Sequence, residues 1–167
     1  MILVCYDGSD DARAAIADAG RVLSGHPAIV LTVWVPLTEV LARTAAGSAL
    51  MAGLNTPMVA DEEAESAAER TAAEGAELAR AAGFDASPRA CAQAGSVSDT
   101  IIAQADRANA AAIVMGSRGR TGLQSVLGSV SHAVVQRADR AVMVVPSAEV
   151  VADRRQRLHR GSAQRVD

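Results

Sequence analysis

The sequence contains no lysine, and its 16 basic residues are all arginine. A Walker A phosphate loop, which requires a lysine after its last glycine, is therefore excluded. Aromatic residues make up only 2% of the chain, and the formal net charge is −3. The protein thus lacks the stacking residues and the basic surface of nucleic-acid-binding domains, and we expect no nucleic-acid partner.

Cysteine is also scarce, and Cys5 and Cys91 lie far apart in the sequence. The two cysteines and three histidines show no metal-ligand spacing. No apolar run approaches the ~20 residues that span a bilayer, and the first residues lack the basic segment of a signal peptide. We therefore expect a cytoplasmic protein with reduced cysteines and no membrane contact.

The residues that are abundant are those of a globular domain. Half of the 167 residues are apolar and 21% are charged, which suits one domain with a substantial core. The end of the chain differs, because residues 152–167 carry five arginines against two acidic residues. We expect a domain over residues 1–147 and a polar, arginine-rich C-terminal tail over 148–167.

Short apolar runs alternate with amphipathic stretches along the domain. The runs predict strands over 2–6, 29–35, 89–94, 111–115 and 141–145. Helices are expected from the cap Ser9 to Leu23, over 61–82, after Ser96 or Ser98, and over 130–138. The first helix should bury Ala15, Ala19, Val22 and Leu23, and residues 37–51 should be partly helical or form a mobile flap. This alternation indicates an α/β fold with a single doubly wound, five-stranded parallel sheet, similar to a Rossmann fold.

The most informative segment is the glycine-rich stretch from Gly116 to Ser131, between a predicted buried strand and a predicted helix. Its glycines let backbone N–H groups approach an anion, the helix start offers unpaired donors, and Arg118 and Arg120 add positive charge. A tight turn followed by a helix cap is the simpler interpretation. Because ligands of such sheets bind at the carboxyl ends of the strands, we favour a phosphate site.

Asp7 also stands at the end of a predicted strand. It could simply cap the helix that follows. Together with Asp10 and Asp11 it makes the start of that helix negative, which should repel phosphate. We therefore expect phosphate at residues 116–131, which leaves Asp7 for a ligand hydroxyl or for Mg²⁺.

Several motifs carry a family resemblance: Val4-Cys5-Tyr6-Asp7-Gly8-Ser9, Leu31-Thr32-Val33, Ala94-Gly95, Met115-Gly116-Ser117-Arg118-Gly119, Gly128-Ser129-Val130-Ser131 and Ala141-Val142-Met143-Val144-Val145-Pro146. With these motifs the chain resembles the universal stress protein family over residues 1–147. ATP-binding members carry the pattern Gly, two residues, Gly, nine residues, Gly, then Ser or Thr. In this sequence eight residues separate Gly119 from Gly128.

The resemblance implies a nucleotide-responsive module in the stress response that binds ATP and Mg²⁺. The adenine would lie near Val33, and Asp7 would contact the ribose or the metal. The implied cofactor-binding residues are Asp7, Val33, Met115, Gly116, Arg118, Gly119, Gly128, Ser129, Val130 and Ser131. The resemblance further implies a homodimer through the last strand, Val142 to Val145, and pairing would remove an exposed apolar edge.

Two other functions stay open. A family member that has lost ATP and acts only through protein partners is favoured by the shortened spacer. An enzyme similar to the adenylating ATP pyrophosphatases is the other, but their Ser-Gly-Gly-x-Asp-Ser loop is missing after the first strand. Because no nucleophile–base pair or carboxylate dyad stands out, we expect no catalytic residues and at most slow ATP hydrolysis.

Overall fold

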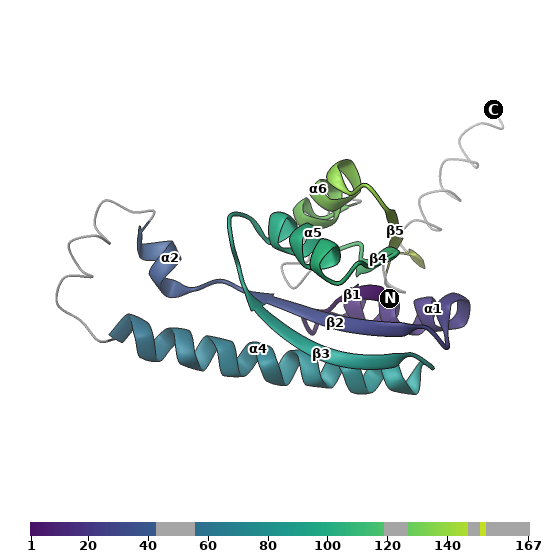
Figure 1. The fold of residues 1–167 in the computed structure, drawn as a ribbon, viewed down its shortest axis with the longest axis horizontal. Helices are drawn as coiled ribbons and strands as arrows, with labels where there is room; N and C mark the ends of the chain where they lie inside the picture. Colours follow the sequence, from purple (N-terminus) through teal and green to yellow (C-terminus); the bar gives the residue numbers. More distant parts are fainter. Residues whose placement is uncertain (43–55, 119–126, 147–150, 153–167) are drawn as a thin grey trace, which may run out of the picture.

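A computed structural model describes residues 1–42, 56–118, 127–146 and 151–152. The predicted alternation of strands and helices is confirmed (Figure 1). The elements are β1 (Ile2–Cys5), α1 (Asp10–Leu23), β2 (Pro27–Trp34), α2 (Leu37–Ala42), α4 (Thr56–Ala81), β3 (Asp85–Ala92), α5 (Val97–Arg107), β4 (Ala112–Gly116), α6 (Ser129–Arg137) and β5 (Ala141–Val145).

The strands form one parallel sheet with the order β3-β2-β1-β4-β5, which confirms the predicted fold class. β1 lies in the middle, and Val4 is in register with Val30 of β2 and Val114 of β4. The chain builds β1, β2 and β3 outward in one direction and then crosses back to add β4 and β5 on the other side. The order therefore reverses between β1 and β4, where ligands of such sheets bind.

Apolar side chains cover both faces of the sheet, as the unbroken apolar strands predict. Val4 and Val30 belong to a cluster with Ala15 and Ile16 of α1 and residues of α4. On the other face, Leu31 packs with residues of α5 and α6, among them Ile101 and Val134. The sheet thus lies between α1 and α4 on one side and α5 and α6 on the other. No helix in the described ranges is long and apolar enough to cross a membrane.

Some predicted details need correction. Val22 is 71% exposed although it lies two turns after the buried Ala15, because the buried residues of α1 run from Asp11 to Gly20 and Val22 is in the last turn beyond them. β3 begins four residues before the predicted start at Arg89 and includes Pro88. This strand is at the sheet edge, where a missing N–H is tolerated.

The segment between β2 and β3 contains more helix than predicted. α4 begins at Thr56, five residues before the predicted start, and it runs along β3 and beyond it toward α2 (Figure 1). Of the stretch 37–51, Leu37–Ala42 is helical, and residues 43–51 lie outside the described residues. The Leu37 N–H donates to the Asp61 carboxylate over 2.6 Å, which joins α2 to α4.

α4 packs against the end of β1 at a single glycine. A Cβ atom at Gly75 would lie 2.6 Å from the Tyr6 ring and 2.8 Å from Val30. Real side chains do not approach that closely, so α4 can lie on the sheet here only because this residue has no side chain. Gly75 therefore fixes the distance between α4 and the segment that follows β1.

Replacement of Gly75 by alanine tests this contact. Alanine gains about 1 kcal/mol in helix propensity, but overpacking costs about 1–3 kcal/mol, so we expect Gly75→Ala to lower the free energy of unfolding. Urea denaturation measures the change. The control Ala73→Gly, on the exposed side of the same helix, should lose about 1 kcal/mol through propensity alone. A Gly75→Ala protein more stable than wild type would contradict the packing argument.

Candidate functional site

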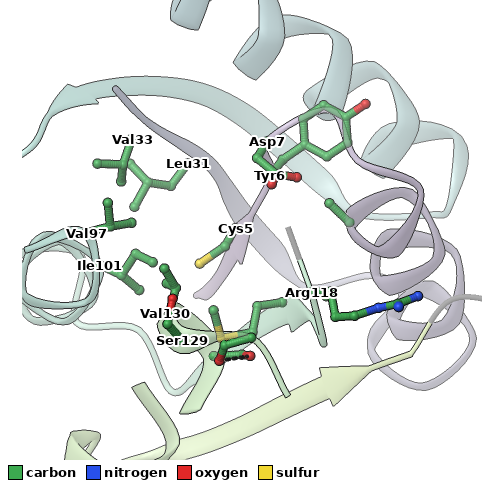
Figure 2. A pocket seen from close by; sticks show the side chains of 15 residues that line it. Cys5, Tyr6, Asp7, Leu31, Val33, Val97, Ile101, Arg118, Ser129 and Val130 are labelled. Atoms are coloured by element: carbon green, nitrogen blue, oxygen red, sulfur yellow. Dashed lines mark hydrogen bonds between the residues drawn. The ribbon is translucent and has the colours of Figure 1, made fainter. Parts of the chain in front are cut away.

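A pocket opens at the carboxyl ends of β1, β2 and β4, where the strand order reverses. It encloses about 730 Å³ of empty space with its open mouth included, within the usual range for small-molecule sites. Figure 2 shows the side chains that line it. They are Cys5, Tyr6, Asp7, Ala12, Leu31, Val33, Val97, Ile101, Met115, Gly116, Arg118, Gly128, Ser129, Val130 and Ser131.

The structure brings nine of the ten predicted cofactor-binding residues together in this pocket, and the tenth, Gly119, lies outside the described residues. Sequence reasoning did not assign the six other lining residues to the site: Cys5, Tyr6, Ala12, Leu31, Val97 and Ile101. Of these, Val97 and Ile101 come from α5. Their apolar spacing indicated only a core face. The predicted cap Ser96, which fixes where α5 begins, was the signal that placed this helix start near the strand ends.

One wall of the pocket is apolar. Leu31, Val33, Val97 and Ile101 lie on one side of Cys5, and Asp7 and Arg118 lie on the other (Figure 2). A flat, weakly polar group such as a nucleobase can bury its faces against branched aliphatic side chains of this kind. The pocket thus has one apolar end and one polar end.

The loop between β4 and α6 is closed by Ser117. The Ser117 carbonyl accepts the Gly128 N–H over 2.7 Å and the Ser131 hydroxyl lies 2.8 Å away, while the Ser117 N–H donates to the Val145 carbonyl over 2.8 Å. These bonds hold Gly128 beside the end of β4. With an eight-residue spacer, Gly128 is thus joined directly to the residue that follows β4.

The start of α6 differs from the starts of α1 and α5. Ser9 caps α1 and Ser96 caps α5, each through a hydroxyl that accepts a backbone N–H. α6 begins after Gly128, which has no side chain to offer, and no side chain among the described residues caps this helix. Its first residues, Ser129 and Val130, line the pocket. An uncapped helix start facing a cavity is an anion-binding arrangement, because its first N–H groups need acceptors.

α1 approaches the end of β4 closely. A Cβ atom at Gly116 would lie 2.7 Å from the backbone of Asp11, so only glycine fits. The Asp11 carboxylate is 6% exposed and accepts the Ser117 hydroxyl over 2.8 Å and the Arg118 N–H over 3.0 Å. The sequence predicted Asp11 only as a charge that repels phosphate. In the structure it also organises the loop after β4.

The Arg118 side chain is turned toward Asp11. Its Nε lies 3.6 Å from Asp11 Oδ2, and its guanidinium points away from the apolar wall (Figure 2). Asp7 accepts the Ser9 N–H over 3.0 Å through Oδ1 while lining the pocket. Within the described ranges, no three His, Cys, Asp or Glu side chains gather where they could hold a metal ion. A metal at Asp7 would need further ligands from a bound molecule.

Tyr6 joins the segment after β1 to α4 and α1. Its hydroxyl donates to Glu74 of α4 over 2.8 Å, and Arg13 of α1 lies 2.5 Å from the same carboxylate oxygen. Burial, followed by the hydrogen bond to Glu74, raises the pKa of Tyr6 to about 12. Burial, followed by the charge of Asp7, also raises the pKa of the Cys5 thiol to about 12. Both groups keep their protons at neutral pH.

The family model described as "Universal stress protein family" matches residues 1–146. A comparison with curated proteins finds no match. A universal stress protein solved in complex with cAMP is 26% identical, with a TM-score of 0.56, over 87% of this chain and 94% of that one.

Two other solved structures share the fold. The universal stress protein of Archaeoglobus fulgidus in complex with dAMP is 22% identical, with a TM-score of 0.56, over 86% of this chain and 95% of that one. Universal stress protein UspA from Lactobacillus plantarum is 20% identical, with a TM-score of 0.63, over 86% and 95%.

The raised pKa of Tyr6 predicts a loss of stability in alkali. The unfolded phenol ionises near pH 10 and the folded one near pH 12, so the stabilisation is complete below pH 10 and is lost as the pH rises to 12. Tyr6→Phe should remove this part of the pH dependence, as measured by urea unfolding at pH 8 to 12. An unchanged slope in Tyr6→Phe would contradict the assignment, and Cys5→Ala separates the contribution of the thiol.

Proposed function

The chain belongs to the universal stress protein family, and on that premise we propose that its pocket binds ATP together with Mg²⁺. The start of α6, which no described side chain caps and whose first residues line a pocket with an apolar wall, carries this proposal. An adenine nucleotide has the same polarity, with a flat base at one end and phosphates at the other. The relative that was solved with cAMP supports an adenine nucleotide as the ligand class.

The base would pack against Val33 and the aliphatic side chains beside it. The phosphates would accept hydrogen bonds at the start of α6 from Ser129, Val130 and Ser131. Gly116 and Gly128 also line the pocket. Because they have no side chains, Asp11 can approach the end of β4 and the start of α6 can lie beside Ser117, which would bring both backbones close to the phosphates. Met115, Arg118 and Gly119 complete the proposed set.

Asp7 would hold the ribose or Mg²⁺. Mg²⁺ usually binds proteins through one or two carboxylates and completes its coordination with phosphate oxygens and water. One carboxylate at the polar end of the pocket fits this pattern when the phosphates arrive with the metal. When bound, the ion would neutralise phosphate charge that Asp7, Asp10 and Asp11 would otherwise repel.

We propose binding rather than turnover as the role of the site. The ionisable side chains that line the pocket are Cys5, Tyr6, Asp7 and Arg118. Cys5 and Tyr6 are protonated at neutral pH, because both pKa values are raised to about 12. Neither group is therefore available as a nucleophile or base, and the protein would act as a nucleotide-responsive module.

We also propose a homodimer through β5. This strand is at the edge of the sheet, and its Val142, Met143 and Val144 are only half-buried in the single chain. An apolar edge strand with unpaired backbone groups is a template for pairing with a second copy. A two-fold axis would then place the same strand on both sides of the interface.

Calorimetric titration with Mg·ATP tests the nucleotide proposal, and saturation near one ATP per chain is expected. Ser129→Asp places a carboxylate in the first turn of α6, where it favours the helix but repels phosphate. We expect this variant to melt no lower than wild type and to bind ATP at least about tenfold more weakly. Cyclic AMP serves as a second probe.

Ser129→Asn is the matched control, because it has nearly the same size without the charge. It should retain most of the affinity for ATP. Equal affinities of Ser129→Asp and wild type would show that the phosphates do not lie at α6. Folded protein freed of copurified nucleotide that binds neither ATP nor cAMP would refute the nucleotide proposal and favour a member that acts only through protein partners.

Light scattering tests the dimer. The wild-type chain should have twice the monomer mass, and Val142→Lys should shift the protein toward monomer because it places a charge on the paired edge. Val59→Lys, on an exposed position of α4, is the control and should remain dimeric. A wild-type protein that is monomeric at high concentration would contradict the proposal.

A further inference from the structure

The Asp11–Arg118 pair lies beside the phosphate end of the pocket. Asp11 is nearly buried, and two hydrogen bonds from Ser117 and Arg118 hold its carboxylate in place. A buried carboxylate needs a nearby cation, because its desolvation is otherwise uncompensated. The Arg118 guanidinium, whose side chain is 21% exposed, supplies that charge.

The pair is incompletely bonded. Arg118 Nε is buried and has no hydrogen-bond acceptor among the described residues, because Asp11 Oδ2 is 3.6 Å away. An unmade hydrogen bond at a buried donor is costly. The side chain is thus held by charge and retains at least one donor for another acceptor. In Figure 2 the Arg118 side chain extends from the pocket wall, and its guanidinium points away from Cys5 and from the apolar side chains.

We propose that Asp11 sets the preference of the pocket among adenine nucleotides of different phosphate number by holding Arg118 away from the phosphates. This inference rests on the proposed nucleotide site. A monophosphate needs only the start of α6 and does not require Arg118. The further phosphates of ATP gain from a guanidinium, but Arg118 reaches them only by giving up its charge interaction with Asp11.

We therefore predict that the wild-type protein prefers ATP over AMP less strongly than it would if Arg118 were free to bind the phosphates. Asp11→Asn removes the charge that holds Arg118, and the amide oxygen still accepts from Ser117 and from the Arg118 N–H. The freed guanidinium can then bind phosphate. The preference for ATP over AMP should therefore rise in Asp11→Asn, and this rise should depend on Arg118 alone.

A double-mutant cycle tests this mechanism. Calorimetry would give the affinities for Mg·ATP and AMP in wild type, Asp11→Asn, Arg118→Gln and the double variant. We expect Asp11→Asn to raise the ATP:AMP affinity ratio about fivefold, and the same change to have no effect when Arg118 is glutamine. Asp10→Asn is the matched control, because Asp10 is exposed in the same turn of α1.

The outcomes separate the explanations. A gain that persists with glutamine at 118, or that Asp10→Asn reproduces, would overturn the proposal in favour of direct repulsion between Asp11 and phosphate. An Arg118→Gln protein with an unchanged ATP:AMP ratio would overturn it as well, and this measurement does not require Asp11→Asn to fold. Unchanged ratios in a protein that binds ATP refute this inference alone, whereas folded wild type without nucleotide binding refutes the proposed function with it.

Discussion

The site depends on one close approach, that of α1 to the end of β4 at Gly116. Because no side chain separates the two backbones there, the Asp11 carboxylate reaches the residues that follow β4. Asp11 orients Ser117, and the Ser117 carbonyl in turn holds Gly128 and the Ser131 hydroxyl. The uncapped start of α6 therefore faces the pocket as the last member of a hydrogen-bonded series that begins in the first turn of α1.

The segment after β1, which carries Asp7, is held in place by α4 and α1. Tyr6 follows β1 directly, and its ring fits against the bare backbone of Gly75 in α4. Glu74 joins the Tyr6 hydroxyl to Arg13 of α1, so three elements meet at one carboxylate. Asp7, the next residue, thus extends from a rigid support. α1 therefore contributes to both parts of the polar end. Its Arg13 shares Glu74 with Tyr6, which precedes Asp7, and its Asp11 lies beside Arg118, so the positions of Asp7 and Arg118 both depend on this helix.

Much of this arrangement could be predicted from the sequence, and the rest required distances between segments. Apolar runs between turn residues predict the strands and that these strands pair in parallel, since such local patterns reflect burial on both faces of the sheet. The glycine pattern likewise predicts which residues gather at the strand ends. Charge alone predicted only part of the role of Asp11, because its role as an acceptor depends on a contact with Ser117, 106 residues away. The prediction that Val22 is buried was wrong because the helical period does not show where the covered part of α1 ends, and that part ends at Gly20. Nucleotide binding and dimerisation stay predictions.

The direct bond between Gly128 and Ser117 has a consequence for how such proteins diverge. It separates the geometry of the site from the length of the chain that connects β4 to α6. A change in the number of residues in this connection would then leave Gly128 beside Ser117, whereas substitutions of Arg118 or Gly119, which belong to the proposed site, would alter the pocket. Descendants of one ancestor can therefore differ in the length of this connection while the same glycine stays beside the end of β4.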